Sequence, residues 1–474
     1  MEPCPLVIGG ESVVTDRIEE VTSPYDGALV SRVCLAGKAE FERAAASAQK
    51  AFEATRAMPR HARRRVLRAI ADRLRGDREG LARTIALEAG KPITQSRAEV
   101  DRGILTFEIA SDEAARLAGE VVPLDLDPRG EGFEATVARM PLGPIAGISP
   151  FNFPLNLVAH KAAPAFAAGN SLVLKPARKT PLSAMRLAAV ALEAGAPPGA
   201  LTVLACDREI GERLVTDERF RMLTFTGSAE AGWGMKARAG RKKVVLELGG
   251  NAGAIVEPDA DLPWAVERCV VGGFSYAGQS CISVQRIYVQ ERVYGAFVAS
   301  LLDRVGKLRV GDPLDPATEV GPVIDEASAA RLIEWLDEAA RRGARILAGG
   351  GRRGTLVEPA VIEGAPPDTA VSYEEAFGPI VTVDRYQALE EALAAVNHSA
   401  YGLQAGLFTH DVRTIRRVFE ALEVGAVIVN EAPTFRMDNT PYGGVKASGL
   451  GREGVRYAIE EMTEPRVLVV NTRR

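Results

Sequence analysis

A regular alternation of short apolar runs with helix-length segments, between residues 136 and 248, most constrains the fold of this chain. The apolar runs predict five strands, over Ile145–Ser149, Leu172–Leu174, Leu201–Leu204, Met222–Phe225 and Val244–Leu248. The segments between them predict four helices, over Leu155–Ala168, Pro181–Ala194, Glu209–Val215 and Ala229–Ala239. Strands joined by helical crossovers form right-handed βαβ units, so we expect an α/β fold with a parallel sheet.

The rest of the chain also has the pattern of an α/β protein. Apolar residues at helical spacing predict helices over 38–55 and 61–89, and the second ends at the stop signal Gly90-Lys91-Pro92. A second α/β stretch runs from about 251 to 447 and includes a strand over Arg286–Val289.

Composition and charge exclude several classes of protein. A length of 474 residues fits two or three domains. Lys and Arg total 58 against 62 for Asp and Glu, so the net charge of -4 gives no global basis for binding nucleic acid. The N-terminus has no basic region followed by an apolar one, and prolines interrupt the longest uncharged run, 140–160. We therefore expect a cytoplasmic protein without nucleic-acid or membrane partners.

The five cysteines, at 4, 34, 206, 269 and 281, form no CxxC pair and no metal-ligand spacing with histidine. An odd number in a long chain fits a reducing compartment better than a disulfide framework, and no metal site is expected. Isolated cysteines are most often buried as small hydrophobes, which is our interpretation of all except Cys281.

Cys281 differs because two other polar residues lie at the expected ligand-binding edge of the parallel sheet. Such sheets bind ligands outside the carboxyl ends of their strands. Asn152 follows the first strand, between Phe151 and Phe153, and Glu247 ends the fifth strand between two leucines. A carboxylate in an apolar strand is costly to bury without a task, and an amide in a rigid Pro-rich turn suits an oxyanion hole.

Seven motifs carry a resemblance to a known family. PFNFP, VLKPA, FTGS, ELGG, GQSCIS, EEAFGP and PYGGVKASGLGREG occur in the order and at spacings similar to the aldehyde dehydrogenase superfamily. The match runs from about residue 20 to the C-terminus. The phrase Arg436–Gly444 most resembles the branch that contains lactaldehyde and phosphonoacetaldehyde dehydrogenases.

The resemblance implies a catalytic role for each of the three polar residues. Cys281 is then the nucleophile, which forms a thiohemiacetal and later a thioester. Asn152 and the backbone N–H of Cys281 bind the oxyanion, and Glu247 activates the water that hydrolyses the thioester. Members that transfer the acyl group to coenzyme A tend to lack this glutamate, so an acid-forming enzyme is favoured. A CoA-acylating enzyme and a non-catalytic binding protein that retains the fold remain the alternatives.

The resemblance also implies that NAD or NADP is bound by the dinucleotide-binding domain. Lys175 matches the lysine at the adenosine ribose, and Glu375 and Phe377 match residues near the nicotinamide, although Glu374 leaves the register of the glutamate open. Gly227 and Ser228 open the helix expected after the fourth strand, where backbone N–H groups suit a pyrophosphate, and Gly232 falls one turn later.

Arg178 occupies a position where many NAD-preferring relatives have a carboxylate. An arginine there can pair with a 2′-phosphate, so we hypothesise that NADP is accepted. The alternative is an exposed arginine without a ligand.

The expected substrate is a small polar or anionic aldehyde. The residues that the resemblance places around the substrate funnel are Phe151, Phe153, Ile282, Ser283, Phe435, Arg436 and Arg102. One or two arginines in an apolar mouth suit a carboxylate, phosphate, phosphonate or hydroxyl group. Both arginines are otherwise interpreted as surface ion-pair formers.

Three units are expected from these assignments. Residues 1–118 and 142–249 form a Rossmann-like dinucleotide-binding domain, residues 250–447 the catalytic domain, and residues 119–141 and 455–474 a small β oligomerisation element. The C-terminal run Arg466–Val470 joins a sheet edge in a partner subunit or completes a sheet of its own chain. A homodimer or homotetramer is therefore expected.

Overall fold

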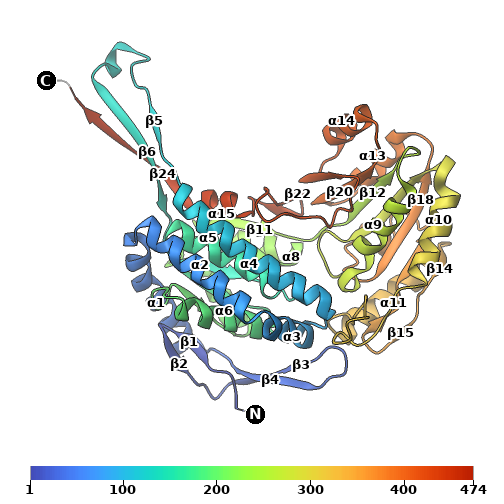
Figure 1. Cartoon of the computed structure of the whole chain (residues 1–474), viewed down its shortest axis with the longest axis horizontal. Helices are drawn as coiled ribbons and strands as arrows, with labels where there is room; N and C mark the ends of the chain where they lie inside the picture. Colours follow the sequence, from blue (N-terminus) through green and yellow to red (C-terminus); the bar gives the residue numbers. More distant parts are fainter. Residues whose placement is uncertain (1, 473–474) are drawn as a thin grey trace.

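The computed structural model describes residues 2–472, which form two α/β bodies and a projecting β arm (Figure 1). The expected α/β fold is confirmed. In the first body a six-stranded sheet has the order β23-β11-β10-β7-β8-β9. Its strands are β7 (Ile145–Ile148), β8 (Leu172–Lys175), β9 (Leu201–Val203), β10 (Met222–Thr226), β11 (Lys243–Glu247) and β23 (Gly449–Leu450).

All pairings among β7 to β11 are parallel, and the antiparallel strand β23 closes the edge beside Glu247. The crossover helices are α5 (Asn156–Ala168), α6 (Leu182–Glu193), α7 (Arg208–Thr216) and α8 (Ala229–Arg238). The bounds expected from the apolar runs agree with these to within a few residues. Burial on both faces explains why these strands have continuous apolar sequences.

The N-terminal segment adds two hairpins and four helices to this body. The hairpins pair β1 (Leu6–Ile8) with β2 (Glu11–Val13) and β3 (Ile18–Thr22) with β4 (Leu29–Cys34). The helices are α1 (Lys38–Ala57), α2 (Arg60–Gly76), α3 (Arg78–Ala89) and α4 (Ile93–Arg116). The helical region expected over 61–89 is present as two helices, α2 and α3. It breaks at Asp77, because Gly76 and Asp77 are both weak helix formers.

The second body contains a seven-stranded sheet in the order β14-β17-β18-β13-β12-β20-β21. Its strands are β12 (Ala252–Val256), β13 (Val284–Gln290), β14 (Arg345–Ala348), β17 (Ala360–Glu363), β18 (Ile380–Tyr386), β20 (Gln404–Phe408) and β21 (Ala426–Val429). All neighbours are parallel except β14 and β17. Its helices are α9 (Leu262–Phe274), α10 (Glu291–Val305), α11 (Glu326–Arg341), α12 (Ala370–Tyr373), α13 (Leu389–Asn397) and α14 (Val412–Ala421).

The arm is a three-stranded antiparallel sheet in the order β24-β6-β5. It combines β5 (Glu120–Val122), β6 (Phe133–Pro141) and the C-terminal strand β24 (Thr463–Asn471), and it extends away from both bodies (Figure 1). The C-terminal strand therefore completes a sheet of its own chain. Residues 455–462, expected with the arm, instead include α15 (Val455–Glu461), which packs against α4 and α5.

Within residues 2–472, each helix is too short or too polar to span a bilayer.

Candidate active site

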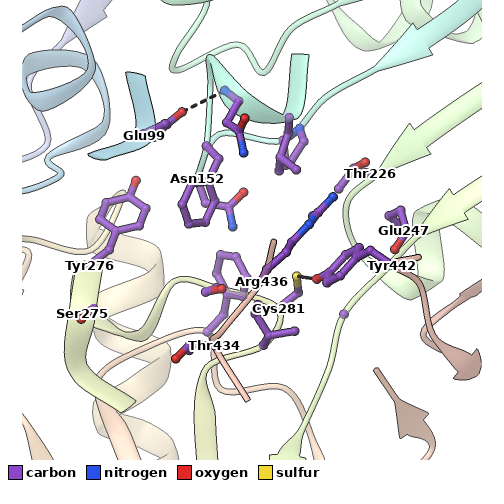
Figure 2. A pocket seen from close by; sticks show the side chains of 18 of the residues that line it. Glu99, Asn152, Thr226, Glu247, Ser275, Tyr276, Cys281, Thr434, Arg436 and Tyr442 are labelled. Carbon is purple, nitrogen blue, oxygen red and sulfur yellow. Dashed lines mark hydrogen bonds between the residues drawn. The ribbon is translucent and has the colours of Figure 1, made fainter. Parts of the chain in front are cut away.

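A cavity of about 620 Å³ lies where the first body meets the second. Its lining combines the loop after β7 and the ends of β10 and β11, which lie at the carboxyl edge of the first sheet, with the loop before β13 of the second body. Asn152, Glu247 and Cys281 all line this cavity (Figure 2). The structure thus brings together the three candidate catalytic residues, although Asn152 and Cys281 are 129 positions apart in the chain.

Cys281 is presented by an unusual backbone turn. The preceding short helix η2 (Ser275–Gly278) has left-handed φ angles of 49° at Tyr276 and 51° at Ala277, a conformation that L-residues rarely adopt. A Cβ on Gly250 would lie 2.1 Å from the Cys281 carbonyl oxygen, so the glycine lets this loop approach the end of β11.

The Cys281 thiol lies in a site that disfavours its charge. Burial raises the pKa of the thiol to about 12, and the hydrogen bond with Tyr442 acts in the opposite direction. The Cys281 Sγ lies 3.1 Å from the Tyr442 Oη. The remaining cysteines carry free thiols, and three of them are buried, namely Cys34, Cys206 and Cys269.

Asn152 is 3% exposed and its side-chain amide points toward the cysteine loop (Figure 2). The Nδ2 donates to the Gln279 carbonyl at 2.9 Å, which leaves its second hydrogen for another acceptor. The loop that carries Asn152 is held from behind, because the Glu99 Oε1 accepts from the backbone N–H groups of Leu155 and Asn156 at 2.9 and 3.2 Å. This amide is therefore a fixed donor against the loop that carries Cys281.

Glu247 is the last residue of β11 and is 3% exposed. Neither carboxyl oxygen has a hydrogen-bond partner among the side chains and backbone groups of the described chain. Burial raises the pKa of this carboxyl well above its ordinary value, and the nearby Glu453 raises it further. A carboxyl of this kind holds its proton at a pH where an ordinary glutamate is ionised, and it becomes a base as the pH rises.

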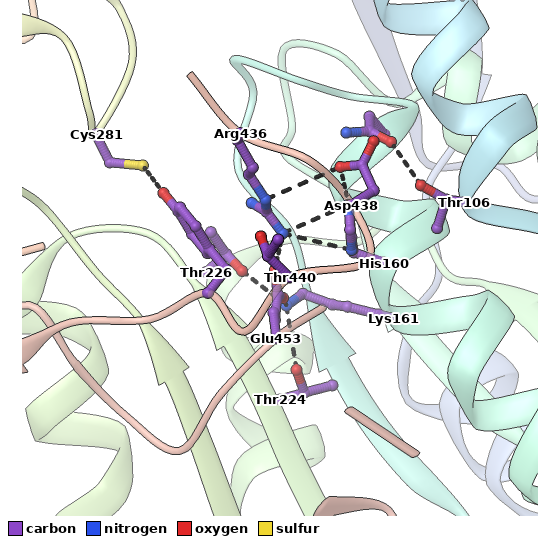
Figure 3. A network of polar contacts seen from close by, with 12 residues as sticks. Thr106, His160, Lys161, Thr224, Thr226, Cys281, Arg436, Asp438, Thr440 and Glu453 are labelled. Carbon is purple, nitrogen blue, oxygen red and sulfur yellow. Dashed lines mark hydrogen bonds and ion pairs between the residues drawn. The ribbon is translucent and has the colours of Figure 1, made fainter. Parts of the chain in front are cut away.

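A buried network of charged side chains adjoins the cavity (Figure 3). Lys161 donates to Glu453 at 3.0 Å, and Arg436 reaches the other Glu453 oxygen at 3.3 Å. Asp438 accepts from His160 at 2.8 Å, and burial of His160 lowers the pKa of its ring. The network thus holds Arg436 between two carboxylates.

The candidate cofactor residues at the end of β10 also border the cavity. Gly227 and Ser228 line it, and the Ser228 hydroxyl caps α8 by accepting from the Ala231 N–H. Gly232 lies one turn into α8 and is buried. Gly227 and Ser228 thus stand at a helix N-terminus, where backbone N–H groups suit a phosphate.

Glu375 and Phe377 also line the cavity. The Glu375 Oε1 accepts from the Gly250 N–H at 2.9 Å, and burial raises the pKa of this carboxyl to about 7. Glu374 is exposed and is not among the described residues that line the cavity, whereas Glu375 is. Phe377 packs edge-to-face on Phe151, with ring centroids 5.7 Å apart.

Lys175, Arg178 and Gly232 are not among the described residues that line the cavity. Lys175 ends β8 beside Gly211, where the backbone leaves room for its stem. Arg178 has a 62% exposed side chain and forms a two-pronged ion pair with Glu19, at 2.8 and 2.7 Å. Arg178 is thus an accessible cation that already has a carboxylate partner.

Six of the candidate substrate residues line the cavity, namely Phe151, Phe153, Ile282, Phe435, Arg436 and Arg102. Ser283 instead donates to the Gly272 and Gly273 carbonyls, which fixes the cysteine loop on α9. Arg102 forms an ion pair with the buried Asp438 at 2.7 Å, and Arg436 is almost fully buried. The interpretation of Arg436 as a surface ion-pair former is therefore wrong, whereas Arg102 is a partly exposed ion-pair former that also borders the cavity.

Sequence reasoning missed Tyr442, Lys161, His160, Asp438 and Glu453 as members of the site. A signal was present in α5, where His160 and Lys161 interrupt an alanine-rich apolar helix, and a buried lysine requires partners. Their partners come from the C-terminal segment almost three hundred residues later, which no local pattern indicates.

Comparison with known proteins agrees with this geometry. The model of the aldehyde dehydrogenase family matches residues 13–468. A 3-sulfolactaldehyde dehydrogenase from Priestia aryabhattai is 44% identical over 467 residues, which cover 98% of each chain.

Two solved structures share the fold. Aldehyde dehydrogenase 21 from Physcomitrella patens, in complex with the reaction product succinate, has a TM-score of 0.97 and 42% identity, covering 100% of this chain and 99% of that one. Glyceraldehyde-3-phosphate dehydrogenase from Methanocaldococcus jannaschii, complexed with NADP, has a TM-score of 0.93 and 37% identity, covering 96% and 100%. The family model and the relatives span nearly the whole chain, and on these grounds the chain belongs to the aldehyde dehydrogenase family.

Proposed function

We propose that this enzyme oxidises a small polar or anionic aldehyde to its carboxylic acid with NAD or NADP. The observation that carries the proposal is the meeting of Cys281, Asn152 and Glu247 in one cavity. Family membership supports it, because the family model covers residues 13–468 and so includes all three residues. A non-catalytic protein has no need to keep a thiol, an oriented amide and an unpaired buried carboxyl together.

Each of the three residues then has a defined step. The Cys281 thiolate attacks the aldehyde carbon, forming a C–S bond while the carbonyl electron pair moves to oxygen. The Asn152 amide and the Cys281 backbone N–H bind that oxyanion, and each such donor typically lowers the barrier by roughly 3–4 kcal/mol. Glu247 later takes a proton from the water that hydrolyses the thioester. Acid formation is favoured over acyl transfer to CoA because this carboxyl is present.

The residues around the cavity fit a dinucleotide cofactor. Gly227 and Ser228 offer helix N–H groups to a pyrophosphate, and Glu375 places an acceptor for a ribose hydroxyl near Phe377. When bound, the nicotinamide ring accepts the hydride of the aldehyde carbon. Arg178, with Lys175 at the same sheet edge, is proposed to meet a 2′-phosphate, and the relative from Methanocaldococcus jannaschii is complexed with NADP.

Arg436 is proposed to bind the polar end of the substrate. Its guanidinium lines the cavity, and its Nε, which lies 3.9 Å from the Asp438 carboxylate, has no hydrogen-bond partner among the groups described in residues 2–472. Arg102, also at the cavity, adds a second positive charge. The relatives support an anionic group, because one is named for 3-sulfolactaldehyde and another holds succinate.

We also propose a cytoplasmic homodimer or homotetramer in which the arm is the oligomerisation element. The apolar side chains of Val467, Leu468 and Val469 are exposed on β24, which lies at an edge of its sheet. The two α/β bodies serve as the dinucleotide-binding and catalytic domains. Sedimentation of the wild type and of Leu468→Lys tests the assembly, and a smaller particle is expected for the variant.

The direct test of the reaction is NAD(P)H production across lactaldehyde, succinic semialdehyde, phosphonoacetaldehyde and simple aliphatic aldehydes. We expect turnover with a free acid as product and complete loss in Cys281→Ala. Rapid acyl-CoA formation without free acid would support the acylating alternative, and nucleotide binding without turnover on any aldehyde would support the binding protein.

A further inference from the structure

Tyr442 is placed to act on the reactive sulfur. Its ring is 4% exposed, and its Oη lies 3.1 Å from the Cys281 Sγ (Figure 2). The backbone of Tyr442 is fixed by two hydrogen bonds with Glu453, at 3.0 and 2.7 Å. The hydroxyl therefore has a defined position and does not depend on a flexible loop.

Arg436 lies over the face of this tyrosine, with its guanidinium carbon 3.6 Å from the ring centroid. A cation over an aromatic face withdraws electron density from the ring and makes the phenol a stronger donor. Burial raises the pKa of Tyr442 well above its ordinary value, so the phenol keeps its proton. Arg436, Tyr442 and Cys281 thus form a continuous contact from a buried cation to the thiol.

We propose that Tyr442 is a catalytic residue whose hydroxyl donates a hydrogen bond to the Cys281 thiolate and stabilises it for attack on the aldehyde. In the resting pair either atom can be the donor. On ionisation the thiol proton passes to solvent water, the S–H electron pair stays on sulfur, and Tyr442 retains its own proton. The inference rests on the proposed role of Cys281 as the nucleophile.

The surroundings of the Cys281 thiol mostly oppose its ionisation, so a hydrogen bond from Tyr442 has a large effect on the thiolate. Burial and the carboxyls of Glu375 and Glu247 disfavour the thiolate, whereas Tyr442 and Arg436 favour it. A hydrogen bond to a charged group is stronger than one between neutral groups, so its gain comes mainly when sulfur is ionised. Tyr442 consequently assists formation of the nucleophile more than it stabilises the resting fold.

The test compares the full-length wild type with Tyr442→Phe, which keeps the ring and removes the hydroxyl. The rate of iodoacetamide alkylation is measured on the Cys281 peptide by mass spectrometry between pH 7 and 9. We expect the thiolate fraction to fall about tenfold while each thiolate becomes roughly threefold more nucleophilic, a net slowing of about threefold. The kcat/KM for an aldehyde is expected to fall at least as much.

Tyr386→Phe is the matched control. Tyr386 is a buried tyrosine that donates to Glu257 at 2.6 Å in another part of the second body. We expect Cys281 in the Tyr386→Phe variant to be alkylated at the wild-type rate. Equal slowing in both variants, or unchanged alkylation in Tyr442→Phe, overturns the proposal. A slower alkylation in Tyr442→Phe of a protein that oxidises none of the aldehydes would leave the contact supported and remove the proposed dehydrogenase function instead.

Discussion

Lys91 and Glu99 form an ion pair that is almost completely buried, and the Lys91 Nζ lies 3.7 Å from the centre of the Phe153 ring. The same ammonium group is 4.5 Å from the ring of Tyr276, in the turn that presents the cysteine. Glu99 meanwhile accepts the backbone N–H groups at the start of α5. One cation therefore connects the loop of Asn152 with the loop of Cys281.

Replacing Lys91 with methionine is expected to lower the free energy of unfolding by about 3–5 kcal/mol, because it leaves a buried carboxylate without its partner. Urea denaturation measures the effect. Lys307→Met provides the comparison, since Lys307 pairs with Asp303 on the surface and is expected to cost less than about 1 kcal/mol. Similar losses of unfolding free energy in Lys91→Met and Lys307→Met would show that burial does not make the Lys91–Glu99 pair more important for stability than a surface pair.

The parallel sheet, and the place of Asn152 and Glu247 at its ligand-binding edge, were predictable from sequence for a physical reason. Each strand is a continuous apolar run because both faces are covered, and the ends of such strands converge on one edge. The network of His160, Lys161, Arg436 and Glu453 was not predictable in this way. Its contacts join α5 to the C-terminal segment, and only the packing of distant elements determines which buried charges meet.

Glu247→Gln is expected to separate the two halves of the reaction. Cys281 still forms the thioester, so a first burst of NAD(P)H close to one equivalent per site is expected. Hydrolysis then lacks its base, and the steady rate falls about 10²–10⁴-fold. Stopped-flow absorbance of NAD(P)H measures both the burst and the steady rate. Glu374→Gln, at an exposed residue next to Glu375, is the control and is expected to turn over normally. A normal steady rate in Glu247→Gln would assign the base elsewhere.

The pH dependence of Glu247 follows from the direction of its shift. Its pKa is raised by burial, so the carboxyl is protonated where an ordinary glutamate is ionised. The rate of thioester hydrolysis should therefore rise with pH in a range where an ordinary glutamate is already fully ionised. A deacylation rate that is flat from pH 5 to 8 would show that the carboxyl is already ionised.

Arg436→Met is expected to lower kcat/KM selectively for anionic aldehydes. A hydrogen bond to a charged group contributes roughly 1.5–3 kcal/mol, so the ratio between an anionic aldehyde and a neutral one of similar size should fall about 10–100-fold. Any effect through Tyr442 is common to both substrates and cancels in the ratio. Arg416→Met, on the exposed face of α14, should leave the ratio unchanged. An equal loss on both aldehydes removes the proposed substrate contact.

The ion pair between Arg178 and Glu19 gives a test of cofactor choice. Removing the carboxylate in Glu19→Gln frees the guanidinium for a 2′-phosphate, and the kcat/KM ratio of NADP to NAD is expected to rise up to about fivefold. Arg178→Ala is expected to shift the ratio toward NAD. If neither variant changes the ratio, Arg178 does not contact the cofactor.

Glu88 should make stability depend on pH. It is buried against the start of α6, and burial raises its pKa to about 7. Since the folded pKa exceeds the unfolded value of about 4.5, the folded state binds more protons between these values, and the stabilisation present below pH 4.5 is lost as the pH rises through 7. The loss amounts to about 3 kcal/mol. Compared with Glu88→Gln by urea denaturation, the wild type should become relatively less stable from pH 5 to 8, and a constant difference would contradict the shift.

The pairing of β23 with β11 and of β24 with β6 has a consequence for how the protein is made. The strand that carries Glu247 is completed by Gly449 and Leu450, and the arm is closed by the last strand of the chain. Chains fold from the N-terminus as they are synthesised, so both bodies are largely present before these strands emerge. The active-site sheet and the arm are therefore completed only when β23 and β24 have been synthesised. A chain that terminates before Gly449 lacks the strand beside Glu247 and the strand that pairs with β6.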